Sequence, residues 1–142
     1  MRIFLDANIL VTVLCNEYPR FTYCSRVLSL CDNPRFEVYT SPICLAIAFY
    51  FAEKKNGHDL ARKKIILLSE KIKIATVDES IVKKAVSDKL VKDFEDGMQY
   101  YAALAAKCKC IITEDKSDFY FSKLETHTAE EFLLKHLKLI KG

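Results

Sequence analysis

The amino-acid sequence predicts a single α/β domain over residues 1–142, a three-layer α/β/α sandwich with a central, mainly parallel sheet. Short apolar runs that suit buried strands alternate along the chain with longer segments of helical periodicity. Strands that alternate with helices favour a parallel sheet covered on both faces. The length is that of one ordinary domain. Only three glycines and three prolines occur, so no segment has the composition of a linker.

The first third of the chain alternates strand and helix patterns. Residues 2–5 form an apolar run typical of a buried strand, and residues 7–17 continue as a helix or helical turn. A second helix is predicted over residues 21–31, because apolar side chains recur there at helical spacing until "DNP" ends it. Residues 36–41 alternate like a strand, and Pro42 begins a helix that runs to about residue 53.

The middle of the chain contains two further helices around a short strand. Gly57 breaks the preceding helix, and residues 59–72 have the pattern of a long amphipathic helix. Residues 73–77 predict a short strand. Asp78 then suits the N-cap of a helix that runs to about residue 87.

The last third repeats the alternation. Residues 93–96 open an alanine-rich helix, and a strand follows at residues 110–113. A short strand is predicted near residues 124–126. The final helix begins at "TAEE", where Thr128 and Glu131 have capping-box spacing.

Charge and hydropathy exclude some classes of protein. The net charge of +3 is mildly basic, which is compatible with an acidic partner such as nucleic acid but does not establish one. No run reaches the ~18 apolar residues that a membrane-spanning helix needs. The N-terminal stretch is interrupted by Asp6 and Asn8 and lacks a cleavage-site pattern, so we expect no signal peptide.

The cysteines indicate a reducing compartment. Six are present, without a Cys-x-x-Cys pair and mostly inside apolar segments. Disulfide frameworks belong to small secreted chains with regular cysteine spacing. We therefore expect buried, reduced cysteines and a cytoplasmic protein.

Acidic side chains follow the predicted strands or open the helices between them. Asp6 ends the first strand, and the remaining acids of this group are Asp93, Glu95, Asp96, Asp115 and Asp118. In an open parallel sheet, ligands bind outside the carboxyl ends of the strands, near a topological switch point. The sequence therefore predicts that carboxylates from three distant segments meet at one edge of the sheet.

Crowded carboxylates favour a bound cation. Two like charges about 4 Å apart repel by roughly 4 kcal/mol at an effective dielectric near 20. Hard oxygen ligands without a set of histidines indicate Mg²⁺ or Mn²⁺ rather than zinc. Such ions serve phosphodiester chemistry by activating water and by neutralising charge on the phosphoryl oxygens.

Several of these acids also have purely structural explanations. Asp93 suits an N-cap, and the helix dipole alone favours Glu95 and Asp96 in a first helical turn. Asp118 suits a turn or the cap of a short helical turn. Asp6 and Asp115 are harder to explain in this way, because an acid at the end of a buried strand must find partners.

Three stretches, in this order and at these separations, resemble the PIN-domain proteins. They are "IFLDANIL" at residues 3–10, "DFEDGMQYYAA" at residues 93–103 and "IITEDKSDF" at residues 111–119. The resemblance covers essentially the whole chain. It is greatest to the small bacterial members related to VapC toxins.

This resemblance implies a PIN-like fold and a metal-dependent endoribonuclease that hydrolyses RNA with Mg²⁺ or Mn²⁺ as cofactor. It also implies the toxin of a toxin–antitoxin pair, with an antitoxin protein as partner, and a homodimer. Asp6, Asp96 and Asp115 match the family's metal-binding catalytic acids, and Asp118 matches an additional acid near them. Asn8 and Thr113 match polar residues that support the pocket.

One position departs from the family pattern. PIN nucleases commonly carry Glu in a Ser-Pro-x-x-Leu-Ala-Glu context, whereas "SPICLAIAFYF" has Ile47 at that point. Glu53 lies roughly 9 Å further along the helix axis and does not replace it. Asp93 or Asp118 supplies the missing charge in one hypothesis. In the alternative, the protein is a catalytically weak or inactive PIN-like domain that binds RNA or a protein partner.

Other enzyme classes fit less well. "DANILV" has Asn8 where a phosphoaspartate hydrolase has its second acid, and the three isolated glycines form no phosphate loop. The three histidines are separated and have no visible nucleophile partner. A group of aromatic residues suits either stacking on unpaired bases or packing in a core or dimer interface: Phe49, Tyr50, Phe51, Tyr100 and Tyr101.

Overall fold

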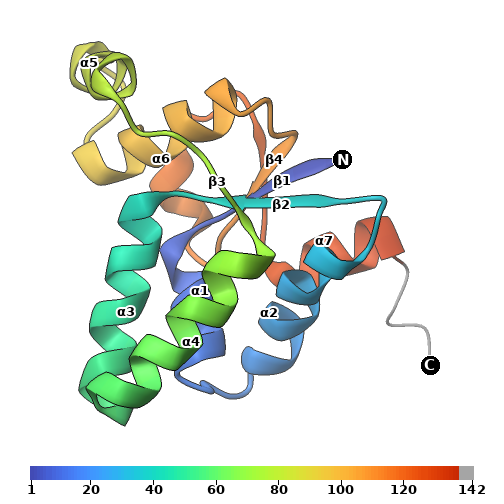
Figure 1. Cartoon of the computed structure of the whole chain (residues 1–142). Helices are drawn as coiled ribbons and strands as arrows, with labels where there is room; N and C mark the ends of the chain where they lie inside the picture. Colours follow the sequence, from blue (N-terminus) through green and yellow to red (C-terminus); the bar gives the residue numbers. More distant parts are fainter. Residues whose placement is uncertain (138–142) are drawn as a thin grey trace.

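The computed structural model describes residues 1–137 and has the predicted α/β architecture (Figure 1). In these residues, five strands form one sheet: β1 (Arg2–Leu5), β2 (Glu37–Thr40), β3 (Lys73–Ile74), β4 (Cys110–Ile112) and β5 (Glu125–His127). The α-helices are α1 (Ala7–Leu14), α2 (Phe21–Leu28), α3 (Pro42–Asn56), α4 (His58–Lys71), α5 (Glu79–Ser87), α6 (Phe94–Ala105) and α7 (Ala129–Leu137). Two 3₁₀ helices, η1 (Ser29–Asp32) and η2 (Lys116–Phe119), complete the described chain.

The sheet is parallel throughout, with the strand order β3-β2-β1-β4-β5. After β1 the chain crosses to β2, and after β4 it crosses in the opposite direction to β5. The boundary between β1 and β4 is therefore the topological switch point, where open parallel sheets bind their ligands. The pairing of Leu5 with Ile112 places the residues that follow these two strands side by side.

Helices cover both faces of the sheet, which gives the predicted three layers. In Figure 1, α5 and α6 lie on one side of the sheet, and α1, α2, α3, α4 and α7 lie on the other. The long connection from β3 back to β4 carries α5 and α6. This connection is what brings the N-terminus of α6 to the switch point.

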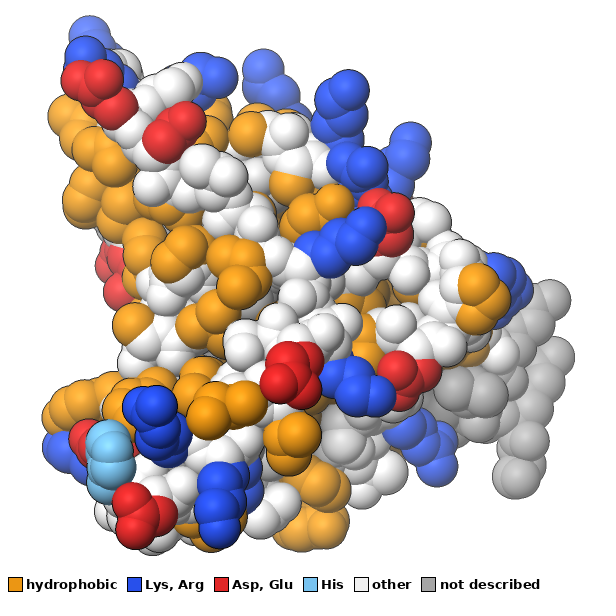
Figure 2. Space-filling view, viewed as in Figure 1, with side chains coloured by type: hydrophobic (Ala, Val, Ile, Leu, Met, Phe, Trp, Pro, Cys, Tyr) orange, Lys and Arg blue, Asp and Glu red, His pale blue; other side chains and the backbone are white. Residues whose placement is uncertain are grey.

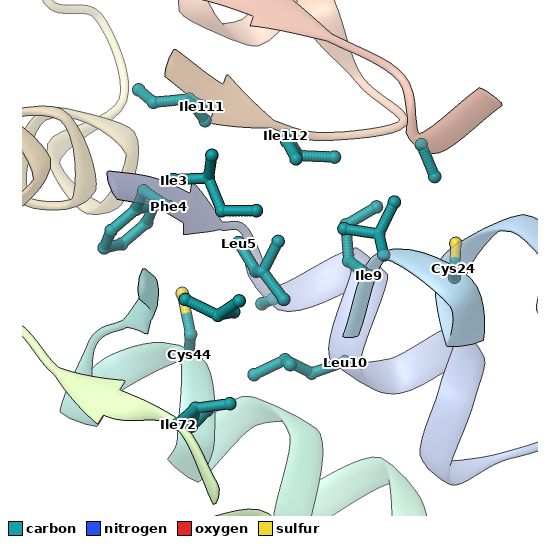
Figure 3. Packing of buried hydrophobic residues seen from close by; sticks show 14 of the residues in the cluster. Ile3, Phe4, Leu5, Ile9, Leu10, Cys24, Cys44, Ile72, Ile111 and Ile112 are labelled. Carbon is teal, nitrogen blue, oxygen red and sulfur yellow. The ribbon is translucent and has the colours of Figure 1, made fainter. Parts of the chain in front are cut away.

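The core is centred on the two middle strands. Ile3, Phe4 and Leu5 of β1 and Ile111 and Ile112 of β4 are fully buried and pack against apolar residues of the helices (Figure 3). Each such side chain stabilises the fold by about 1.5–3 kcal/mol relative to exposure. Burial on both faces is the reason these strands are continuous apolar runs.

Helix starts follow the predicted capping chemistry. Asp78 accepts a hydrogen bond from the Ile81 N–H at 3.1 Å and caps α5. Thr128 and Glu131 form the predicted capping box, with reciprocal bonds of 2.8 Å and 3.1 Å at the start of α7. Both caps confirm the sequence-based prediction.

Some element boundaries differ from the prediction. The helix predicted over residues 7–17 ends at Leu14, because Asn16 adopts a left-handed conformation with φ of 52°. The helix predicted over residues 21–31 ends at Leu28 and continues as the tighter η1. The strand predicted over residues 73–77 is reduced to β3, and both of its residues are exposed. The first strand has the predicted bounds, and the other boundaries shift by at most three residues.

The remaining features of the fold concern the cysteines, the lengths of the helices and the exposed hydrophobic residues. All six cysteines are free, and all except Cys31 are buried. No helix in residues 1–137 is long and apolar enough to cross a membrane. Figure 2 shows an indentation in the surface, with α5 and α6 on one side of it and α3 and α4 on the other. Hydrophobic side chains are exposed on both sides of this indentation. The large hydrophobic residues with the most exposed side chains include Tyr18, Leu67, Val86 and Leu90.

Candidate functional site

A cavity of about 310 Å³ lies at the switch point, beside the carboxyl ends of β1 and β4. Six carboxylates line it: Asp6, Glu17, Glu95, Asp96, Asp115 and Asp118. The lining also includes Asn8, Arg20, Ile47 and Phe51. The structure thus brings four predicted metal-binding acids, Asp6, Asp96, Asp115 and Asp118, to one cavity.

Asp6 is the most deeply buried of these acids, at 7% exposure. Its Oδ1 accepts a hydrogen bond from the Ala7 N–H at 2.8 Å, which caps α1. Its Oδ2 accepts a bond from the Thr113 hydroxyl at 2.9 Å. Burial raises the pKa of Asp6 to about 6 despite these bonds, and the negative charges of Glu95 and Asp115 act in the same direction.

Asn8 and Thr113 connect the two strand ends. The Asn8 amide donates to Thr113 Oγ1 at 3.0 Å and to Asp115 Oδ2 at 3.3 Å. Its Oδ1 accepts a bond from the Glu114 N–H at 3.2 Å. Thr113 Oγ1 also accepts a bond from the Asp115 N–H at 3.1 Å. These bonds fix Asp115 relative to Asp6.

Asp96 reaches the cavity from the first turn of α6. Asp93 is the N-cap of this helix, and its Oδ1 accepts a bond from the Asp96 N–H at 3.1 Å. Burial, followed by the neighbouring charges of Asp93, Asp6, Asp118 and Glu95, raises the pKa of Asp96 to about 7. Asp93 does not line the cavity. It acts on the site as a helix cap and a nearby charge.

The carboxylates approach the site from separate segments and do not form a preassembled cage. In residues 1–137, no group of three or more His, Cys, Asp or Glu side chains is arranged to hold a metal ion. The donor set nevertheless fits Mg²⁺ or Mn²⁺, because it consists of hard oxygen atoms. Burial, and after it the neighbouring carboxylates, raise the pKa values of Asp6 and Asp96, and a bound cation would favour their charged forms.

Several cavity residues lie outside the predicted set of site residues. The sequence offers a helix-dipole role for Glu95, yet this residue lines the cavity, and burial followed by the charge of Asp93 raises its pKa. Glu17 and Arg20 come from the segment between α1 and α2, which carries no motif. Phe51 was noted only as an aromatic residue with two alternative roles. Its position one helical turn after Ile47 was the available signal.

Arg20 is held beside the cavity by a largely buried acid. Its Nε lies 3.9 Å from Glu114 Oε2, and the Glu114 side chain is 11% exposed. Glu114 Oε1 accepts bonds from the Cys24 thiol at 3.6 Å and from the Ala129 N–H at 3.4 Å. Glu114 therefore joins α2 and the start of α7 to the segment that carries Asp115.

A buried polar contact joins the helices on opposite faces of the sheet. The Ser41 hydroxyl donates to Gln99 Oε1 and accepts a bond from the Cys44 N–H at 3.1 Å. Both Ser41 and Gln99 are fully buried. The contact sets α6, which carries Asp96, against the start of α3, which carries Ile47.

The sequence profile of the PIN domain matches residues 2–117. The chain therefore belongs to the PIN domain family, as the sequence motifs indicated. It is 28% identical over 136 residues to Ribonuclease VapC1 of Aquifex aeolicus (strain VF5), an alignment that covers 92% of each chain.

Solved structures have the same fold. VapBC-1 from nontypeable Haemophilus influenzae superposes with a TM-score of 0.69 at 21% identity, over 92% of this chain and 99% of that one. A toxin–antitoxin complex from Klebsiella pneumoniae gives a TM-score of 0.66 at 17% identity, over 89% of this chain and 97% of that one. These similarities confirm the predicted PIN-like architecture.

Proposed function

We propose that this protein is a ribonuclease that hydrolyses RNA phosphodiester bonds with the help of Mg²⁺ or Mn²⁺. The observation that carries the proposal is the convergence of Asp6, Asp96, Asp115 and Asp118 on one cavity at the switch point. The similarity to a ribonuclease over nearly the whole chain supports it.

The residues of the chain have distinct roles in this proposal. When bound, the cation supplies positive charge for the phosphoryl oxygens and lowers the pKa of a water. Asp6, Asp96 and Asp115 hold it, and Asp118 assists. Thr113 and Asn8 orient Asp6 and Asp115 through the bonds described above. No side chain at the site is required to form a covalent intermediate with RNA.

The biological role proposed is that of a toxin with a protein antitoxin as partner. The relative from Aquifex aeolicus is a VapC, and the structure from Klebsiella pneumoniae is a toxin–antitoxin complex. We expect a small antitoxin to be encoded next to this protein. Co-expression of the neighbouring gene product should give a stable complex in which RNA cleavage is inhibited. A homodimer stays a prediction that sedimentation velocity can check.

A second candidate is a PIN-like domain that binds RNA or a protein without cleaving RNA. Ile47 favours it, because this aliphatic side chain lines the cavity where the family commonly has Glu. Asp118 lines the same cavity and is the better placed of the two acids proposed to supply the missing charge. Asp93 does not line it.

The proposal is tested by incubating a pool of structured and unstructured RNA with Mg²⁺, with Mn²⁺ or with chelator. We expect cation-dependent cleavage by the wild type and its loss in Asp6→Asn and Asp115→Asn. Asp59→Asn is the matched control, because Asp59 is an exposed acid of α4 that does not line the cavity.

Two outcomes count against the ribonuclease. If the folded wild type cleaves no RNA with either cation, the binding candidate is favoured. If Asp6→Asn and Asp115→Asn cleave as fast as the wild type, the activity does not come from this cavity. In the binding candidate, Asp6→Asn leaves the affinity for the partner unchanged.

A further inference from the structure

The cavity has an apolar wall beside its carboxylates. Ile47 and Phe51, four residues apart on α3, both line it. Residues at this spacing lie on the same side of a helix, one turn apart. Phe51 is 46% exposed, so much of its ring is accessible to a ligand. A metal-binding role for the acids does not explain why an apolar surface lies in the same cavity as six carboxylates.

The cavity also has one positive charge. Arg20 is the single basic side chain among the described residues that line it. An RNA strand carries a phosphate on each nucleotide, so a phosphate next to the scissile one meets the remaining carboxylates unless a cationic group faces it. Arg20 is such a group, and its guanidinium is suited to phosphate oxygens. The walls therefore combine sites for phosphate with an apolar surface.

Resting on the proposed ribonuclease function, we propose that Ile47 and Phe51 bind one unpaired base of the RNA substrate, next to the phosphodiester at the carboxylates. A nucleotide joins an apolar ring face to a phosphate, and this cavity offers a partner for each. Aromatic side chains stack on bases without regard to sequence, because every base has a π-face. Ile47, where the family commonly has Glu, extends the apolar wall.

The stacking contact requires an unpaired base. Bases in a duplex are stacked on each other, and their faces are not free to meet Phe51. Stacking contacts to RNA are accordingly made mostly in loops, bulges and ends. The cavity volume of about 310 Å³ is at the small end for ligand pockets, which span about 300–1,000 Å³, and suits one base.

The test measures binding rather than cleavage. A fluorescent single-stranded RNA of eight nucleotides is titrated with the protein, with Ca²⁺ in place of Mg²⁺ to slow hydrolysis, and anisotropy is recorded. The titration is repeated with a series of oligonucleotides of the same sequence, each of which lacks the base at one position. This series locates the base that contributes to affinity. We expect one abasic position to weaken binding to the wild type by about 5- to 150-fold, the range for loss of one base–aromatic stack.

Variants then assign this effect to Phe51. Phe51→Ala should bind the intact oligonucleotide as weakly as the wild type binds the abasic one. The affinity of Phe51→Ala should be the same for the intact and the abasic oligonucleotide. Phe51→Trp should keep both the affinity and the abasic effect. Leu60→Ala is the matched control, because Leu60 is 45% exposed on the neighbouring helix α4 and does not line the cavity. It should behave like the wild type.

The inference fails if Phe51→Ala and the wild type show the same affinities across the abasic series. It also fails if the RNA binds equally well as a duplex, or if Phe51→Ala leaves RNA binding intact but converts a dimer to a monomer in sedimentation velocity. The last result would mean that a second copy covers Phe51. If one abasic position weakens binding but the protein cleaves no RNA with Mg²⁺ or Mn²⁺, the base site stands and the ribonuclease proposal fails. If the protein cleaves RNA and Phe51→Ala binds RNA as the wild type does, the ribonuclease proposal stands and the base site fails.

Discussion

Thr113 is the residue at which the parts of the site meet. Its hydroxyl donates to Asp6 and accepts bonds from the Asn8 amide and the Asp115 N–H. Thr113 and Asp6 are both buried, so without this hydroxyl Asp6 Oδ2 would lose a donor that water does not readily replace, whereas Asn8 and Asp115 are partly exposed at the cavity. A single hydroxyl thus sets the relative positions of two acids that are 109 residues apart in the sequence.

Replacement of Thr113 by Val should therefore destabilise the protein and weaken any activity of the site. Val keeps the shape but leaves the buried carboxylate of Asp6 without this donor, which costs about 1–3 kcal/mol. Urea unfolding monitored by circular dichroism measures the loss. Thr113→Ser retains the hydroxyl and should keep most of the stability. Equal unfolding midpoints for Thr113→Val and the wild type would show that the hydroxyl does not hold the site together.

Single residues differ in how well the sequence predicts them. Asp6 and Asp115 follow a buried strand and Asp96 opens a helix, so local pattern alone placed them at one edge of the sheet. Arg20 could not be predicted as a cavity residue, and the only signal for Phe51 was its position one helical turn after Ile47. Both reach the cavity because α1 packs against α2 and α3, and the local sequence does not encode that packing.

At the scale of elements, α6 packs closely at Gly97 against α5 and against the connection between the two helices. A Cβ at Gly97 would lie 2.6 Å from Val91 Cγ1 and 3.2 Å from the Ala85 Cβ. Gly97 directly follows Asp96, so the closeness of these helices affects an acid of the site. In an unpacked helix, Gly costs roughly 1 kcal/mol relative to Ala.

Gly97→Ala should consequently destabilise the protein, although alanine favours helices. Overpacking of a tight contact typically costs about 1–3 kcal/mol. The double variant Gly97→Ala/Val91→Ala removes the closest atom and should recover part of the lost stability. Chemical denaturation of both variants measures this. If Gly97→Ala alone is more stable than the wild type, the two helices are not in tight contact.

Elements were predicted best where a chemical signal marks their ends. Pro42, Asp78 and the Thr128–Glu131 pair start helices where the sequence indicates. The strand over residues 73–77 was predicted too long, because apolar composition does not show how far an edge strand stays paired. The break between α2 and η1 also has no marker in the sequence.

At the scale of the whole molecule, the chain topology concentrates negative charge on a mildly basic protein. The net charge is +3, yet the cavity at the switch point is lined by six carboxylates. The alternation of strands and helices was enough to predict the parallel sheet. The strand order was not predicted, since it depends on which strands pair after collapse, and it is the order that brings β1 beside β4.

Burial of these carboxylates, together with their mutual repulsion, should make stability depend on pH when no cation is bound. The folded-state pKa values of Asp6 and Asp96 are raised from 3.8 to about 6 and about 7. The stability that their protonation contributes is present below about pH 4 and is lost as the pH rises through 6 and 7. The melting temperature in chelator should therefore fall by more between pH 5 and pH 8 in the wild type than in Asp96→Asn.

Other titrating groups do not produce this difference. Hydrogen bonds lower the pKa values of Glu37 and Asp88, so their contributions change only below about pH 5. Burial lowers the pKa of His136, which makes the protein more stable as the pH rises. These groups are the same in both proteins. Identical pH profiles for the wild type and Asp96→Asn would show that the folded protein does not disfavour ionisation of Asp96.

The measurement that tests the account most directly is a crystal structure with Mn²⁺, in which anomalous scattering locates the ion. Our account predicts a strong peak in the cavity at the switch point, coordinated by oxygen atoms of Asp6, Asp96 and Asp115. Absence of that peak at a Mn²⁺ concentration that supports RNA cleavage, or a peak bound by other residues, would contradict it.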